Sequence, residues 1–116
     1  MIRRFIATLV VALPTTVTQH AAAQMVSSPN RALQMASDTG GIAGGGAYCQ
    51  VDPEMVEQYI TRALARVAAL TDDQLDLVAA RIEFNNTYAA ASAREPEGGC
   101  DELTRRFPGL LRQLDE

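Results

Sequence analysis

The sequence predicts a small all-α domain closed by one disulfide and preceded by a disordered Gly-rich tail. Apolar residues recur at three- and four-residue spacing between positions 53 and 93, which is the period of a helix with one buried face. No segment alternates apolar and polar residues as a half-buried strand does. The chain has two cysteines, Cys49 and Cys100. We therefore expect a three-helix domain over residues 49–116, with its third helix broken, after a flexible tail at residues 24–48 and a signal peptide at residues 1–23.

The N-terminal segment has the three parts of a secretory signal. Arg3 and Arg4 precede an apolar stretch from Phe5 to Leu13, and the segment ends in the small residues Ala21 to Ala23. The apolar stretch is far shorter than the roughly 20 residues that span a bilayer. Arginine without lysine is typical of GC-rich bacterial genes. We expect cleavage after Ala23 and export to the periplasm, with no membrane insertion once the leader is removed.

The composition of the mature chain excludes several classes of function. Residues 24–116 contain eight arginines, no lysine and 14 acidic residues, a net charge near −6. Binding to nucleic acid or to anionic lipid needs a basic surface, so neither is expected. The one histidine, His20, leaves with the leader, which removes Ser–His–Asp and Cys–His catalysis. We expect no enzymatic activity, no cofactor and no metal site.

Residues 24–48 are rich in Ser, Gly, Ala and Met and include a glycine-rich run from Gly40 to Gly46. Such a composition buries little surface and loses much entropy when ordered, so we interpret it as a flexible tail. A phosphate-binding loop would need a following Lys-Ser or Lys-Thr pair, which is absent.

The first predicted helix begins with Asp52 as N-cap and Pro53 at the first helical position, and it ends near Leu70. Its apolar residues fall on one face, as expected for a helix packed on one side. They are Val56, Tyr59, Ile60, Ala63, Leu64, Val67 and Leu70.

The second predicted helix runs from Thr71, acting as N-cap in a capping box with Gln74, to about Ala93. It carries two separate apolar stripes, which indicates a helix packed on two sides, against other helices or against another subunit. One stripe is Leu75, Val78, Ile82 and Ala89, and the other is Leu77, Phe84 and Tyr88.

Polar residues of this helix have structural interpretations. Asp72, Asp73 and Asp76 lie at its start, where carboxylates favour the positive helix end, and the spacing lacks the glycine that a calcium-binding loop requires. Arg81 and Asn85 lie between the two stripes, and we interpret them as a partly buried polar pair with a role in recognition as the alternative.

The third predicted helix follows Cys100. Pro108 interrupts it, so we expect a short turn over Asp101–Arg106 and a second helical piece that begins at Pro108.

The ordered part has about 68 residues, a size at which one core leaves little net stability without a covalent link. The loop between Cys49 and Cys100 has about 50 residues, and closing it is worth about 4 kcal/mol in the chain-entropy treatment. The bond would join the starts of the first and third helices, which would then run roughly parallel, with the second helix antiparallel between them.

These observations favour a non-enzymatic protein-interaction module, such as an inhibitor, an adaptor or an accessory subunit. We expect a protein partner at a surface formed by Leu77, Arg81, Phe84 and Tyr88, and a homodimer through the same surface is a further option. A structural component of an envelope assembly, tethered by the Gly-rich tail, is an alternative.

The layout of residues 49–116, with one cysteine before an early helix and one before the last, resembles the small periplasmic acid-stress chaperones of the HdeA kind. The resemblance implies a helical fold and the exposure of apolar surface in acid. It rests on organisation and the two cysteines alone, so it transfers no functional residue. Excess carboxylates without histidine would place such a switch near pH 4.

Overall fold

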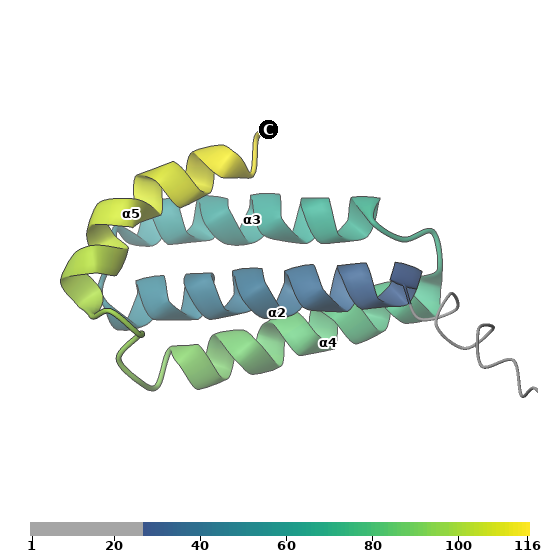
Figure 1. The fold of residues 1–116 in the computed structure, drawn as a ribbon, viewed down its shortest axis with the longest axis horizontal. Coiled ribbons are helices and arrows are strands. Elements are labelled where there is room, and N and C mark those ends of the chain that lie inside the picture. The colour runs from purple at the N-terminus through teal and green to yellow at the C-terminus, as the bar shows by residue number, and fades with distance from the viewer. Residues whose placement is uncertain (1–26) are drawn as a thin grey trace, which may run out of the picture.

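The computed structural model describes residues 27–116, which form four helices and no strand (Figure 1). They are α2 (Ser27–Tyr48), α3 (Pro53–Ala69), α4 (Gln74–Ala91) and α5 (Cys100–Gln113). The predicted all-helical fold with one disulfide is confirmed. The predicted signal peptide and residues 24–26 lie outside the described residues.

The predicted flexible tail is wrong over residues 27–48, because they form α2, the central helix of the domain. Figure 1 shows α2 between α3 and α4. Small residues recur along α2 at four-residue spacing, and Ala32, Ala36, Gly40 and Gly44 are all buried. The domain therefore has four helices where the sequence predicted three, and the Gly-rich run is part of its core and not a tether.

Glycine is required in α2 because α4 approaches it at backbone distance. A Cβ atom at Gly40 would meet the backbone of Phe84, and one at Gly44 would lie 2.8 Å from the Cβ atom of Ala91. Real Cβ atoms do not approach that closely. Because higher-numbered residues of α2 meet higher-numbered residues of α4, the two helices run parallel. α3, which lies between them in the sequence, runs antiparallel to both (Figure 1).

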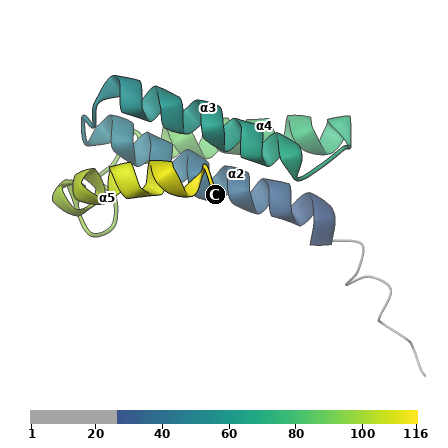
Figure 2. The same ribbon diagram turned by 90° about the horizontal axis from the view of Figure 1, so that it is seen from above.

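The other side of α2 packs against α3 and α5, and here the largest buried side chains gather. The rings of Tyr59 in α3 and Phe107 in α5 lie 5.3 Å apart and are almost fully buried. A Cβ atom at Gly46 would touch the Phe107 ring, so this glycine makes room for the aromatic pair. Figure 2 shows α5 lying along α2 on the side away from α4.

The start of α3 is as predicted, whereas that of α4 is not. Asp52 caps α3 by accepting a hydrogen bond from the Glu54 amide at 2.9 Å, with Pro53 in the first turn. The N-cap of α4 is Asp73 and not Thr71, because the Asp73 carboxylate accepts hydrogen bonds from the amides of Leu75 and Asp76. The Thr71 hydroxyl instead accepts one from the Asp73 amide. The helix ends at Ala91, slightly before the predicted end.

The predicted break of the last helix at Pro108 is also wrong. α5 is assigned as one helix with Pro108 inside it, and it changes direction along its length (Figure 1). Proline removes one backbone hydrogen bond and bends a helix. The burial of Phe107 and Leu111 on either side of Pro108 holds the two turns against α2 and α3.

Cys49 and Cys100 form the predicted disulfide. It joins the residue that follows α2 to the first residue of α5. α3 and α5 both run away from this end of the domain, as expected (Figure 1). α4 runs antiparallel to them, but it does not lie between them, because α2 separates α3 from α4.

Candidate functional site

The predicted interaction surface is divided by the fold. Phe84 is 2% exposed and packs against α2, so it belongs to the core and is not available to a partner. Leu77 and Tyr88 are half-buried beside it, whereas Arg81 is exposed. Asn85 is exposed as well, so Arg81 and Asn85 do not form the expected partly buried pair.

The stripe on the opposite face of α4 is the exposed one. Leu75 is 80% exposed, Val78 53% and Ile82 55%, and all three point away from α2 because they lie about half a helical turn from Ala80 and Phe84. We call these three residues the outer stripe. Both stripes of α4 follow from the sequence, but which of them is buried does not, because α2, the helix that covers one of them, was predicted to be a flexible tail.

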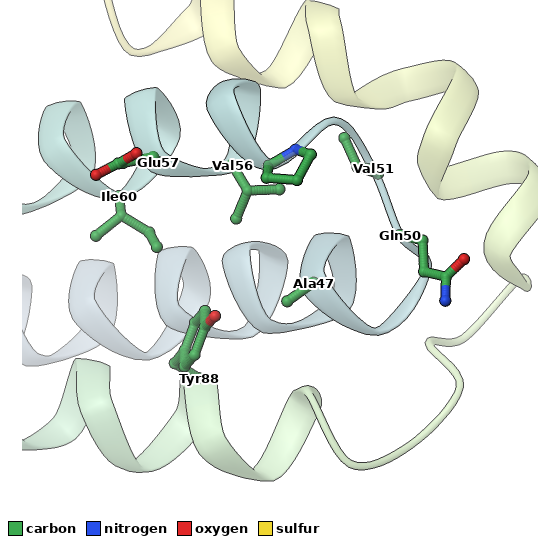
Figure 3. A pocket seen from close by; sticks show the side chains of 8 residues that line it. Ala47, Gln50, Val51, Val56, Glu57, Ile60 and Tyr88 are labelled. Atoms are coloured by element: carbon green, nitrogen blue, oxygen red, sulfur yellow. The ribbon is translucent and has the colours of Figure 1, made fainter.

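A groove lies between α3 and α4, with α2 as its floor (Figure 3). It has a volume of about 400 Å³, within the range of small-molecule sites in proteins. Most of its lining is apolar, and Glu57 and Tyr88 add polar groups on opposite walls. The lining residues are Ala47, Gln50, Val51, Pro53, Val56, Glu57, Ile60 and Tyr88. Sequence analysis missed this groove because its floor belongs to α2.

Two contacts of arginine side chains join α3 to the end of α5. The Arg62 guanidinium lies 2.8 Å from the Asp115 carboxylate, and Arg66 donates a hydrogen bond to the Leu114 carbonyl at 3.3 Å. Both contacts are exposed, so each contributes at most about 1 kcal/mol to stability. They fix the C-terminal turn of α5 and create no reactive centre.

Tyr59 is the group whose ionisation the fold alters most clearly. Burial raises the pKa of its hydroxyl from 10 to about 12, and the nearby carboxylate of Asp38 adds to the increase. The tyrosine therefore stays protonated at every physiological pH, which suits a core residue.

Among residues 27–116, no three His, Cys, Asp or Glu side chains are grouped closely enough to hold a metal ion. Asp73 of the acidic group caps α4, in agreement with its interpretation as a helix start. Within the described part of the chain, no helix has the length and apolarity needed to cross a membrane.

Comparison of the chain with known protein families, with curated proteins and with solved structures found no match.

Proposed function

We propose that this protein is an exported, non-enzymatic interaction module that binds a protein partner through the outer stripe of α4. The observation that carries the proposal is the exposure of Leu75, Val78 and Ile82, which ranges from 53 to 80%. Contiguous exposed aliphatic side chains are characteristic of interaction sites, because leaving them in water costs free energy that a partner recovers. Fully burying one such side chain is worth about 1.5–3 kcal/mol.

The spacing of the outer stripe indicates how the partner binds. Positions 75, 78 and 82 follow the i, i+3, i+7 pattern of a helix that inserts its apolar face into a groove of another protein. α4 is suited to this role because its opposite face is anchored on α2 through Ala80 and Phe84, so the helix needs no ordering when it binds. An inhibitor, an adaptor or an accessory subunit would use such a surface.

The Cys49–Cys100 bond supports export, because disulfides persist in oxidising compartments such as the periplasm. Cleavage after Ala23 is the remaining part of this proposal. Mass spectrometry of the protein recovered from the periplasmic fraction tests it: a mature chain that begins at Gln24 is expected, and recovery of an intact leader in the cytoplasm would contradict export.

The binding experiment compares the oxidised mature protein with the variant Leu75→Gln/Ile82→Gln as bait for periplasmic extract. Both positions are exposed and glutamine is a good helix former, so the variant should keep the wild-type circular dichroism spectrum. We expect the wild-type protein to capture a partner that the double variant does not capture. The matched control is Leu70→Gln, an exposed leucine outside α4, which should still retain it.

The other outcomes have definite meanings. Retention of the same proteins by the double variant would refute the outer stripe as the contact surface. A concentration-dependent dimer in sedimentation, lost in the double variant, would identify the partner as a second copy of the chain. Protection of an aggregation-prone client at pH 3 but not at pH 7 would replace the proposal with the acid-stress chaperone.

A further inference from the structure

The groove between α3 and α4 remains open because no described side chain fills it. α3 and α4 each make most of their contacts with α2 and few with each other. Ala47, on the last turns of α2, is too small to rise from the floor into the space (Figure 3). The result is a groove of about 400 Å³ on a different face from the outer stripe.

The walls of the groove are apolar close to the floor and polar towards the rim. Val56 and Ile60 of α3 form one wall and face Tyr88 of α4 across the opening (Figure 3). Glu57 stands at the rim on α3 and is the one lining residue that carries a charge at neutral pH.

Two polar groups at the groove are free to meet a ligand. Among the described residues, neither the Glu57 carboxylate nor the Tyr88 hydroxyl makes a side-chain hydrogen bond or an ion pair with the protein. Both can therefore be offered to a bound molecule without breaking an existing contact. An apolar site with a few polar groups is the usual composition of a small-molecule site.

We propose that this groove binds a small amphipathic cation, with its apolar body between Ile60 and Tyr88 over Ala47 and its cationic head at Glu57. The charge follows from the lining, because an anion at the rim would be repelled by the Glu57 carboxylate and would find no basic residue among the lining residues. The apolar body follows from the wall composition, and its size from the volume of the groove. A partner helix, about 10 Å across, would fill this volume with only about one turn, so the groove suits a small molecule better than a helix.

The experiment titrates the oxidised mature protein with three probes that share one chain length: octylammonium, octanol and octanoate. Amide chemical shifts report both the affinity and the location of binding. We expect octylammonium to shift the resonances of Ala47, Ile60 and Tyr88 and to bind about tenfold more tightly than octanoate, because an exposed ion pair is worth a factor of about two to five and octanoate replaces it with repulsion. Octanol should lie between the two.

Two variants test the assigned roles. Glu57→Gln removes the charge and keeps the shape, so it should weaken octylammonium about two- to fivefold and leave octanol unchanged. Glu54→Gln is the matched control, since it makes the same change one helical turn earlier, outside the lining, and should leave both affinities unchanged. Ala47→Leu should fill the floor and abolish binding of all three probes, and if this variant does not fold, the pair of glutamate variants still decides the question.

Equal affinities for octylammonium and octanoate would overturn the proposal, as would an equal loss in Glu57→Gln and Glu54→Gln. Shifts confined to Leu75, Val78 and Ile82 would also overturn it, because the probe would then have bound the outer stripe. Since the Leu75→Gln/Ile82→Gln variant leaves the groove intact, it should bind octylammonium normally, and failure of the proposed partner binding would not affect this result.

Discussion

The close approach of α4 to α2 makes opposite predictions for two neighbouring glycines of the same helix. Alanine is about 1 kcal/mol more favourable than glycine within a helix. At Gly41 an added Cβ atom would have no heavy atom within 4 Å, so Gly41→Ala should raise the free energy of unfolding by this full amount. At Gly44 the same atom would overlap the Tyr88 carbonyl and would lie 2.8 Å from the Ala91 Cβ atom and 3.0 Å from the Ser92 nitrogen.

The loss of stability expected for Gly44→Ala follows from these contacts. Ordinary carbon contacts are about 3.5–4.0 Å long, so α4 must withdraw by about 1 Å, and a gap of that size loses a quarter to a half of each dispersion contact that it opens. Overpacking of this kind costs about 1–3 kcal/mol, and the upper end applies because backbone atoms cannot rotate away. After the helix gain is subtracted, Gly44→Ala should lower the free energy of unfolding by about 2 kcal/mol.

Urea unfolding of the oxidised protein, followed by far-ultraviolet circular dichroism, measures both effects. We expect the free energies of unfolding of the two variants to differ by about 3 kcal/mol. In thermal unfolding, their melting temperatures should fall on opposite sides of the wild type, because 1 kcal/mol shifts the melting temperature of a domain of this size by about 4–8 °C. If Gly44→Ala is as stable as Gly41→Ala, then α2 and α4 do not pack at backbone distance and the described arrangement is refuted.

Three further predictions concern other parts of the domain. The double substitution Cys49→Ser and Cys100→Ser should lower the free energy of unfolding by about 4 kcal/mol, because the bond closes a loop between residues 51 positions apart; an unchanged urea midpoint would contradict this. Asp73→Ala should cost about 1 kcal/mol in the same assay and Thr71→Ala much less, and the reverse order would make Thr71 the true cap. Because burial raises the pKa of Tyr59, ionisation of its hydroxyl favours the unfolded chain. The stability that the neutral tyrosine contributes is complete below pH 10 and is lost as the pH rises towards 12. Urea midpoints measured across that range should fall, and Tyr59→Phe should flatten the fall.

Local signals in the sequence predicted the parts of the fold that depend on neighbouring residues. The Asp52-Pro53 start, the buried face of α3 and the cysteine pair could all be recognised from short-range patterns. α2 could not be recognised from propensity, because five glycines oppose a helix and only packing against α4 and Phe107 overcomes them. The spacing of Ala32, Ala36, Gly40 and Gly44 was the available signal, since small residues four apart form one face.

The wrong prediction of a flexible tail where α2 forms also explains why the wrong stripe of α4 was predicted to be the interaction surface. Without a helix in the centre, nothing in the sequence said which stripe of α4 was buried, and the Phe84 stripe was predicted to be the interaction surface. Phe84 is buried because Gly40 and Gly44 let this face of α4 approach α2 at backbone distance. The outer stripe is exposed because it lies on the face of α4 that points away from α2.

The glycine content of α2 also determines when this helix can form. Its five glycines make an isolated α2 about 4–5 kcal/mol less favourable than an alanine-rich helix of equal length. α2 makes most of its contacts with α4, which leaves the ribosome well after α2 itself. We therefore expect α2 to become helical only once α4 is present, and a chain that stops before α4 not to fold. Folding is thereby postponed until most of the domain has been synthesised.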